Sequence, residues 1–429
     1  MERDEIVLPA GRLRGVVRVP PSKSDSLRAT LAASLAQGAV GAASRIRHAS
    51  QCADQRALEA FLASVGVEVV HRADGLTVLA KPWKRQGEVS CGESGFLARV
   101  LPLILSAMGW EVVVTGCGSL LHRPVGETAQ LLELLGAAVT TSSGCLPLRT
   151  GGVVQRGIHL ELPEFKSSQP LSGLLMAGPL LVRHAQARFA VSSMRPYPNW
   201  GYLAMTLRTL AAFGVRYRVD MGGRLELLPR SSYTPARYTV EGDWSAAAFL
   251  IVGALMGGRI RLFGLPRTSL QPDAAIAQVS TWPGVRWCWQ GGALEVSGHL
   301  EELRPFEFDC SACPDLIPPL VALGSAIEGC SAIHGASKLA SKESDRGAVL
   351  AEELGKLGVG VTVDGDTLTV EGHSGLKGGA MFSSHDDHRV AMAMACVSLV
   401  CGSPNRLQGW EAVGKSYPGF WEEWAVDGV

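Results

Sequence analysis

The sequence predicts an α/β protein, with α+β character, made of two similar lobes that each contain three β-α-β-α-β-β units. Long apolar segments recur along the chain, each opens on a polar cluster, and an amphipathic segment that ends in glycine follows each of the first five. The apolar segments begin 71 to 75 residues apart, near Ser24, Gly95, Ser168, Asp243, Asp315 and Asp387. This period is too long for a solenoid repeat but suits one compact β-α-β-α-β-β unit.

The apolar segments predict buried helices. Leu27 to Val40, Phe96 to Met108, Leu171 to Val182 and Ala246 to Met256 are apolar nearly all round. A helix without a polar face is stable in water only when other elements cover it on every side. A strand, Val16 to Val19, is expected just before the first of them.

The amphipathic segments predict a second helix in each unit. Their ends read Val65-Gly66-Val67, Leu135-Gly136-Ala137, Phe213-Gly214-Val215, Pro283-Gly284-Val285 and Leu357-Gly358-Val359. Glycine suits the left-handed conformation that closes a helix, and alternating runs such as Val359 to Val363 suit strands. The sixth unit is expected to lack this helix, because the sequence ends soon after Trp424.

Six units make two groups of three. We expect residues 22–240 to form an inserted lobe and residues 1–21 with 241–429 to form a discontinuous one, with crossovers near Pro20-Pro21 and Val240-Glu241. Ligands commonly bind between lobes, so the active site is expected in the interlobe cleft.

Composition excludes several classes of protein. The net charge is zero and aromatic residues make up 6%, which argues against nucleic-acid binding. The most apolar run, Val390 to Gly402, has about 13 residues, short of the roughly 20 that a membrane helix needs. Met1 to Val7 is acidic and resembles no targeting peptide, so a cytoplasmic protein is expected. Cys310 and Cys313 could be half a zinc site or a redox pair, but no second Cys or His pair has metal-site spacing, so they are interpreted as structural. No metal and no cofactor are predicted.

The polar cluster at Ser22-Lys23-Ser24, with Arg28 behind it, indicates an anion site. The first backbone N–H groups of a helix are unpaired and its dipole is positive there, so two cations beside them would hold a phosphate. The alternative is that Ser22 or Ser24 caps the helix while Lys23 and Arg28 lie in solvent. Six such starts facing one cleft favour the anion.

These clusters resemble the motifs of the enolpyruvyl transferases, and in particular of the 5-enolpyruvylshikimate-3-phosphate (EPSP) synthase family, over essentially the whole chain. The matching motifs are Ser22-Lys23-Ser24 with Arg28, Gly95 with Arg99, Arg123-Pro124-Val125, Ser167-Ser168-Gln169, Val240-Glu241-Gly242-Asp243, Pro314-Asp315, Lys342-Glu343-Ser344-Asp345-Arg346, Asp387-His388-Arg389 and Lys415.

The resemblance implies a reaction. The family moves the enolpyruvyl group of phosphoenolpyruvate onto the 5-hydroxyl of shikimate 3-phosphate and releases phosphate, by addition and elimination through a tetrahedral intermediate. Two anionic substrates need several cations and donors, a base for the hydroxyl proton and an acid for the methylene carbon. Both partners are therefore expected to be small molecules, and the family suggests a monomer.

The resemblance also assigns residues. For shikimate 3-phosphate it implies Lys23, Ser24, Arg28, Ser167, Ser168, Gln169, Tyr197, Asp315, Lys338 and Lys342. For phosphoenolpyruvate it implies Lys23, Gly95, Arg123, Gln169, Arg346, Arg389 and Lys415. The implied catalytic residues are Asp315 as the base, with Glu343 and Lys23 handling protons at the methylene group.

Several of these residues have a structural alternative. Arg346 would make a surface ion pair with Glu343 or Asp345, and Lys415 would lie in solvent. Tyr197 would be a core aromatic with its hydroxyl at the surface. His388 is as well suited to bracing the preceding aspartate as to chemistry.

Four positions depart from the family pattern. Leu27 stands where asparagine is common, Phe96 where threonine follows the glycine, Met194 where a serine contacts the substrate phosphate, and Lys338 where asparagine contacts substrate. Met194 puts one phosphate contact in question, whereas Lys338 adds a cation.

Two alternatives remain open. The sister enzyme that transfers enolpyruvyl to UDP-N-acetylglucosamine carries a loop cysteine near the position of Cys117, but it has asparagine where this chain has Ser24 and lacks the Ser-Ser-Gln motif. A non-catalytic paralogue that binds a phosphorylated metabolite is the other, although the retained Asp315 and Glu343 speak against it.

Overall fold

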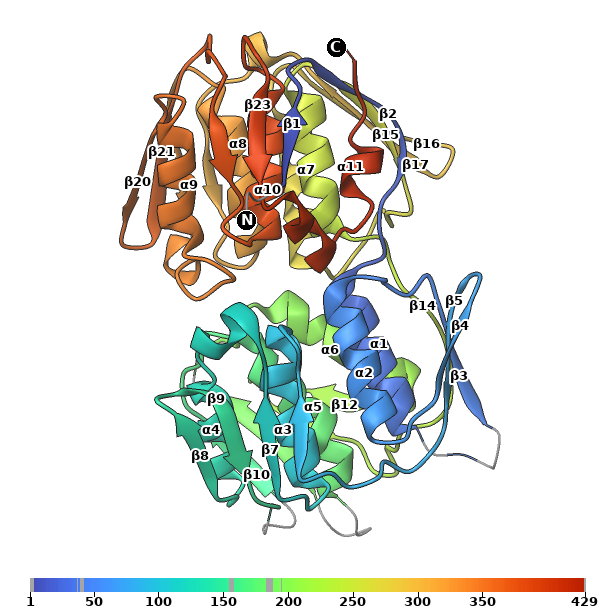
Figure 1. Cartoon of the computed structure of the whole chain (residues 1–429). Helices are drawn as coiled ribbons and strands as arrows, with labels where there is room; N and C mark the ends of the chain where they lie inside the picture. The colour runs from blue at the N-terminus through green and yellow to red at the C-terminus, as the bar shows by residue number, and fades with distance from the viewer. Residues whose placement is uncertain are drawn as a thin grey trace. The chain divides into compact units, whose positions relative to one another are not determined.

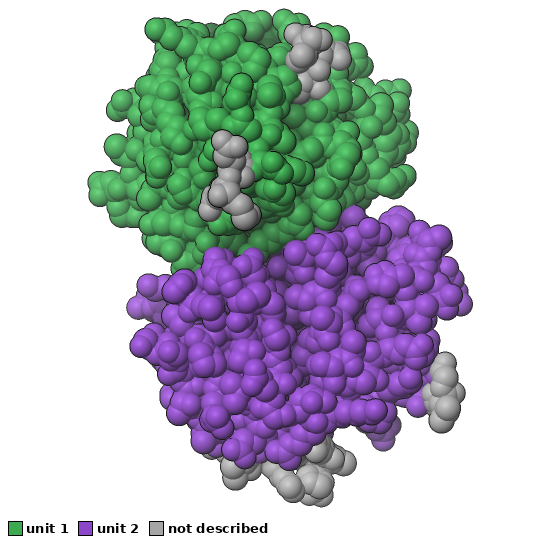
Figure 2. All heavy atoms as spheres, in the orientation of Figure 1, with its two compact units in different colours: residues 1–20, 241–429 green, residues 21–240 purple. Residues whose placement is uncertain are grey.

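The structure, a computed structural model, describes residues 4–36, 38, 42–153, 158–182, 188–193 and 195–427. The chain divides into two compact units, unit 1 with residues 1–20 and 241–429 and unit 2 with residues 21–240 (Figure 2). Both units combine helices with mixed sheets, so the α/β prediction is confirmed (Figure 1). Each unit has its own apolar core.

Three repeats make up unit 2. Its elements are α1 (Lys23–Leu35), β3 (Ala43–Arg47), α2 (Ala53–Ser64), β4 (Val69–Arg72), β5 (Gly75–Leu79), β6 (Glu88–Ser90), α3 (Gly95–Ala107), β7 (Val112–Thr115), the 3-10 helix η1 (Gly118–His122), α4 (Gly126–Leu134), β8 (Val139–Ser142), β9 (Cys145–Thr150), β10 (Ile158–Leu162), α5 (Ser168–Leu181), β11 (Phe189–Ser193), α6 (Trp200–Ala212), β12 (Tyr217–Val219), β13 (Leu225–Leu227) and β14 (Arg237–Thr239).

The sheets of unit 2 share one topology. Their strand orders are β14-β3-β5-β4, β6-β7-β9-β8 and β10-β11-β13-β12. In each, the first two strands are parallel and the other neighbours are antiparallel, as a β-α-β-α-β-β unit requires. The apolar helices α3 and α5 pack closely, because Gly173 would place a Cβ only 2.9 Å from Val100 Cα.

Unit 1 repeats the pattern with its ends rearranged. Its elements are β1 (Glu5–Leu8), β2 (Arg12–Arg18), α7 (Trp244–Leu255), β15 (Arg259–Phe263), η2 (Pro272–Thr281), β16 (Val285–Gln290), β17 (Ala293–Gly298), η3 (Leu300–Glu302), β18 (Glu307–Asp309), η4 (Pro314–Leu316), α8 (Ile317–Ser325), β19 (Gly329–His334), η5 (Ala336–Lys338), α9 (Arg346–Gly355), β20 (Gly360–Asp364), β21 (Thr367–Gly372), β22 (Met381–Ser383), α10 (His388–Ser398), β23 (Asn405–Gln408), η6 (Trp410–Lys415), α11 (Phe420–Glu423) and β24 (Val426–Asp427).

At each of the two crossings between the units, one strand pairs with a strand that is distant in the sequence. The sheet orders of unit 1 are β16-β17-β15-β2-β24, β18-β19-β21-β20 and β1-β23-β22. Strand β2 precedes α1 in the chain but pairs in parallel with β15 of unit 1. Strand β14 precedes α7 of unit 1 but pairs in parallel with β3 of unit 2. Each sheet thereby keeps a parallel first pair although the chain crosses twice.

The polar starts of five apolar helices are N-caps. Side chains at these positions accept a hydrogen bond from a backbone N–H two or three residues ahead: Ser22, Ser94, Ser167, Asp243 and Asp387. The fifth apolar segment differs, because it starts as the 3-10 turn η4 at Pro314 and becomes α-helical only at Ile317. Helix α1 ends at Leu35, and Val40, where its apolar run was expected to end, lies outside the described residues.

The amphipathic helices follow the prediction with two corrections. Helices α2, α4, α6 and α9 form, and the glycines after them have φ of 78° to 85°. The fourth, η2, is a 3-10 helix rather than an α-helix, and it begins at Pro272. In the sixth unit, which was expected to lack a second helix, the short helices η6 and α11 occupy that place. Within the described ranges, none of the helices has the length and apolar character needed to cross a bilayer.

Candidate active site

The carboxylate of Asp315 is the centre of the charged cluster in unit 1. It accepts hydrogen bonds from Lys342 Nζ at 3.1 Å and Arg346 Nη1 at 3.0 Å on one oxygen, and from Arg389 Nη2 at 3.0 Å on the other. The four residues come from η4, the segment before α9, the first turn of α9 and the first turn of α10. Chain positions up to 74 residues apart therefore meet at one carboxylate.

The pKa of Asp315 results from two opposing effects. Burial by itself would raise this pKa, but the charges of Arg389, Lys342 and Arg346 outweigh it and hold the pKa well below its usual value. The side chain is still 19% exposed, so a ligand can reach it. For Lys342, burial lowers the pKa and the neighbouring Asp315 only partly offsets this effect.

Arg346 joins three carboxylates. Its Nε and Nη2 donate to the two oxygens of Asp387 at 2.8 and 3.2 Å, and Nη2 also donates to Glu343 Oε2 at 2.6 Å. The side chain of Arg346 is 1% exposed, so its ion pair with Glu343 lies inside the protein. The structural alternative, which expected this pair at the surface, is therefore wrong. Asp387 binds Arg346 and also caps α10, because Arg389 N donates to its Oδ1 at 2.9 Å.

Three further residues of unit 1 lie at the ends of η5 and η6 and at the start of α10. Lys338, at the end of η5, is half-buried, donates to Ser311 O at 2.5 Å, and has its pKa lowered, mainly by burial. Lys415, at the end of η6, is buried rather than solvated. His388 is buried, and its Nδ1 lies 3.8 Å from Asp387 Oδ1, beyond hydrogen-bond distance.

In unit 2, the start of α1 carries Lys23 and Arg28. Lys23 Nζ lies 3.3 Å from Asp54 Oδ2 and keeps part of its side chain exposed. Arg28 is buried: its guanidinium donates to Thr206 Oγ1 at 2.8 Å and to Ser24 O at 2.8 Å, and it lies 4.8 Å from the ring centre of Phe96. Burial lowers the pKa of Arg28 to about 10. Phe96, which stands where the family usually has threonine, therefore makes a cation–π contact with Arg28.

A second group gathers at the starts of α3 and α5. Arg99 Nη1 donates to Gln169 Oε1 at 3.0 Å and to Gly95 O at 3.1 Å. A Cβ on Gly95 would lie 2.8 Å from Arg99 Nη1 and 2.9 Å from Arg123 Nη2, so Gly95, Arg99, Arg123 and Gln169 share one small space. The motif resemblance gives Arg99 no role, although its position one turn after Gly95 is a sequence signal that places it at this helix start.

Ser167 and Ser168 open α5 beside Glu127. Glu127 accepts from Lys166 N at 2.6 Å and from Ser167 N at 3.1 Å, and so fixes the turn before the helix. Sequence reasoning missed Glu127, because it lies about forty residues earlier and only the tertiary fold brings it to this turn.

The remaining predicted positions are less directly engaged. Tyr197 is half-buried, donates its hydroxyl to Val191 O at 3.3 Å and stacks on Trp200, and burial raises its pKa to about 12. Cys117 is exposed just before η1. Met194 lies outside the described residues.

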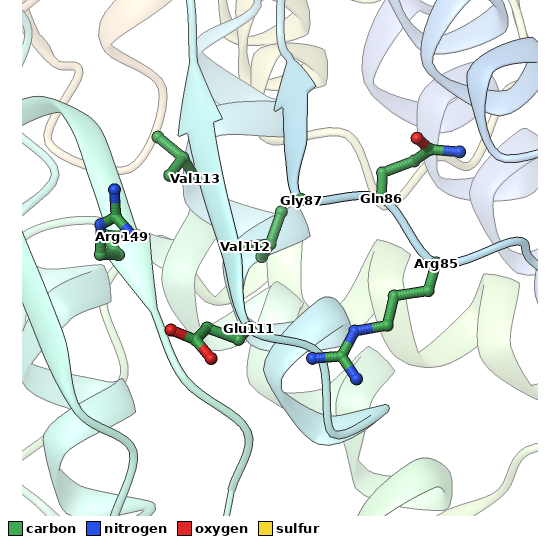
Figure 3. A pocket seen from close by; sticks show the side chains of 7 residues that line it. All are labelled: Arg85, Gln86, Gly87, Glu111, Val112, Val113 and Arg149. Carbon is green, nitrogen blue, oxygen red and sulfur yellow. The ribbon is translucent and has the colours of Figure 1, made fainter.

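Unit 2 also has a shallow hollow of about 470 Å³ away from these residues (Figure 3). Its walls are the segment that leads into β6, the start of β7 and strand β9, with Arg85, Glu111 and Arg149 as charged side chains. The hollow lies at the N-terminal end of β6, whereas α3 and Gly95 follow its C-terminal end. None of the predicted site residues lines the hollow.

Comparisons with known proteins identify the family. Residues 7–424 match the family model of EPSP synthase (3-phosphoshikimate 1-carboxyvinyltransferase). Enzymes of that name from Thermococcus kodakarensis and Clostridium kluyveri are 35% and 34% identical to this chain. The first alignment covers 97% of this chain and 98% of the relative, and the second 96% and 94%.

Solved structures agree with the sequence relatives. EPSP synthase from Acinetobacter baumannii matches with a TM-score of 0.76 at 26% identity, over 98% of this chain and 97% of that one. The enolpyruvyl transferase NikO from Streptomyces tendae matches with a TM-score of 0.73 over 98% and 97%, and its 18% identity bears on the fold alone.

The family match and the structural match to EPSP synthase from Acinetobacter baumannii define a transferase of the enolpyruvyl type. Within that class, the chain belongs to the EPSP synthase family, as the sequence motifs had indicated.

Proposed function

We propose that this chain transfers the 1-carboxyvinyl group of phosphoenolpyruvate to the 5-hydroxyl of shikimate 3-phosphate and releases phosphate. The observation that carries the proposal is the carboxylate of Asp315, which is partly exposed and held by three cations, with Glu343 bound to one of them. A base and several anion-binding groups at one point are what the reaction needs.

The cations of unit 1 suit phosphoenolpyruvate. Arg346 and Arg389 are buried guanidinium groups whose planar N–H donors match carboxylate and phosphate oxygens, and Lys415 is buried at the end of η6. In unit 2, Arg123 and Lys23 are the proposed contacts to the same substrate, with Gly95 leaving space beside Arg123.

Hydroxyl and amide donors of unit 2 suit the other substrate. Ser24, Ser167, Ser168 and Gln169 lie at the starts of α1 and α5, where backbone N–H groups and the helix dipole favour a phosphate. Arg28 is buried and donates hydrogen bonds to Thr206 Oγ1 and Ser24 O. Its proposed contribution is a buried positive charge that also stabilises the turn at Ser24. Tyr197, Lys338, Lys342 and Asp315 complete the proposed set.

Substrate binding would also activate the base. In the unliganded protein, Asp315 has a pKa well below its usual value, so it is a weak base. The phosphate and carboxylate of phosphoenolpyruvate would compete with Asp315 for Arg346 and Arg389, and each cation drawn away raises the pKa of Asp315. The carboxylate would thus become a better base only when phosphoenolpyruvate is in place.

Glu343 and Lys23 would handle the proton at the methylene carbon. Glu343 is nearly buried and bonded to Arg346, so the same competition for Arg346 would raise its affinity for a proton. Lys23 is already paired with Asp54, which keeps it charged and oriented as a donor.

Phosphate release from phosphoenolpyruvate by the purified protein tests the proposal, with shikimate 3-phosphate and UDP-N-acetylglucosamine as parallel acceptors. Release with shikimate 3-phosphate alone is the expected result. Release with the nucleotide sugar alone would indicate the sister activity, and release with neither would indicate a non-catalytic paralogue.

The proposal extends to organisation. We expect a cytoplasmic monomer whose lobes are residues 22–240 and residues 1–21 with 241–429. Light scattering on a size-exclusion column tests the oligomeric state, since a dimer mass at micromolar concentration would contradict a monomer.

A further inference from the structure

Helix α9 contacts the segment before α10 at two places. Arg346 opens α9 and binds Asp387, whereas Glu353, seven residues on, binds His385 and Ser383. Residues seven apart lie about two turns along the same face of a helix. One face of α9 is therefore attached to both ends of the segment 383–387.

Glu353 is a buried carboxylate that the proposed chemistry does not use. Its side chain is 0% exposed, and it accepts from His385 Nε2 at 2.8 Å, Ser383 N at 2.9 Å and Lys356 Nζ at 2.7 Å. Lys356 also donates to Met381 O at 3.0 Å, which attaches the same turn of α9 to β22. A charge buried this fully needs such partners, so the contact holds this part of the segment firmly.

The attached segment has an unfavourable backbone. His385 and Asp386 have φ of 51° and 56°, the left-handed region that residues with a Cβ rarely adopt in succession. Such a conformation persists only where surrounding contacts impose it. Asp387 follows at once, and its direction depends on these two residues.

Asp387 in turn holds Arg346. Ser344 Oγ donates to Asp387 Oδ2 at 3.1 Å and Arg389 N donates to Oδ1 at 2.9 Å, so the carboxylate orders both arginines proposed for phosphoenolpyruvate. A relaxed segment 385–386 would turn Asp387 away from Arg346 and leave this guanidinium to other partners.

We propose that Glu353 and His385 form a positioning pair that imposes the left-handed turn at 385–386 and thereby aims Asp387, and through it Arg346, at phosphoenolpyruvate. Neither residue touches substrate. The inference rests on the proposed function for its consequence in catalysis, but the geometric part concerns the free protein.

The test compares His385→Asn and Glu353→Gln with Glu352→Gln. Asparagine tolerates the left-handed backbone but removes the ring contact to Glu353. In Glu353→Gln the single amide oxygen can still accept from Ser383 N and Lys356 Nζ, whereas the NH2 group that replaces Oε1 can only donate. It keeps a contact with His385 only in the tautomer whose Nε2 is unprotonated. Glu352 is the matched control, because its side chain is 61% exposed and it makes only a 4.0 Å surface ion pair with His385 Nε2, not a hydrogen bond.

The expected kinetic result is selective. His385→Asn should raise KM for phosphoenolpyruvate by about tenfold, because a small misplacement of a binding group is costly, and should change KM for shikimate 3-phosphate less than twofold. Glu353→Gln should retain most of the affinity, and Glu352→Gln should match the wild type. An unchanged KM for phosphoenolpyruvate in His385→Asn, or equal rises in both KM values, would overturn the pair.

Amide hydrogen exchange of the unliganded protein separates this inference from the proposed function. Exchange at residues 384–389 should rise in His385→Asn and stay unchanged in Glu352→Gln, with the other helices protected as in the wild type. A wild type without transferase activity would refute the proposed function, whereas an unaltered exchange pattern in His385→Asn would refute the positioning pair.

Discussion

Replacing Gly95 by alanine tests the space at the start of α3. The added Cβ would lie 2.8 Å from Arg99 Nη1, 2.9 Å from Arg123 Nη2 and 3.0 Å from Arg123 Cζ. Ordinary contacts between such atoms are about 3.5 Å, so each guanidinium must move by roughly half an ångström. Both groups are the ends of flexible side chains, and the shift is therefore cheap for folding but displaces a charge that we assign to phosphoenolpyruvate.

The magnitude follows from this geometry. Gly95 is the first residue of α3, where alanine gains less over glycine than the roughly 1 kcal/mol of a helix interior. The displaced groups are only side-chain ends, so the free energy of unfolding should change by less than about 1 kcal/mol. A binding group misplaced by about half an ångström should raise KM for phosphoenolpyruvate about tenfold, and KM for shikimate 3-phosphate much less.

Steady-state phosphate release at varied phosphoenolpyruvate, combined with urea unfolding, is the assay. Gly126→Ala is the matched control, because Gly126 also opens a helix of unit 2 and a Cβ there meets no atom within 4 Å. A Gly95→Ala variant with wild-type KM for phosphoenolpyruvate would refute the placement of Arg123 at that substrate. A large loss of stability would show that the guanidinium groups do not yield.

Three further predictions concern Asp315 and Cys117. Asp315→Ala should reduce turnover by at least about a hundredfold while shikimate 3-phosphate still binds by calorimetry, as expected on removing an acid–base group; unchanged turnover would remove it from the mechanism. Because the folded pKa of Asp315 lies below its unfolded value, its contribution to stability is present above the unfolded pKa and is lost as pH falls through the folded one. The free energy of unfolding should accordingly fall below about pH 5 more steeply in the wild type than in Asp315→Asn, and parallel urea-unfolding curves at each pH would contradict the assignment. Cys117, an exposed loop residue, should tolerate Cys117→Ser with nearly full phosphate release, whereas inactivation would favour the sister activity.

Much of the fold could be predicted because its signals are local. The apolar runs, the caps such as Ser94 and Asp243, and the left-handed glycines such as Gly66 are each decided by residues within one turn. The 3-10 conformation of η2 was missed because hydrophobic periodicity alone does not distinguish it from a short α-helix.

The candidate site could be predicted only as a set of residue types at helix starts. Motif resemblance named Asp315, Arg346 and Arg389, but the contribution of Asp387, which holds Arg346 with two hydrogen bonds, was visible only in the structure. Glu127 and Glu353 carried no local signal, since glutamate in an amphipathic helix is ordinarily a solvated residue.

The sequence by itself determined the six-fold repeat, the buried helices and their polar starts, because hydrophobic periodicity and capping depend on neighbours in the chain. Only the tertiary structure decided which charges meet, since Arg28 and Thr206 are 178 residues apart and Asp315 and Arg389 are 74 apart. Electrostatic energy depends on distance and burial, and both are properties of the packed chain. A lysine or arginine is thus either a solvated surface group or an ion-pair partner of Asp315, depending on where the helices place it.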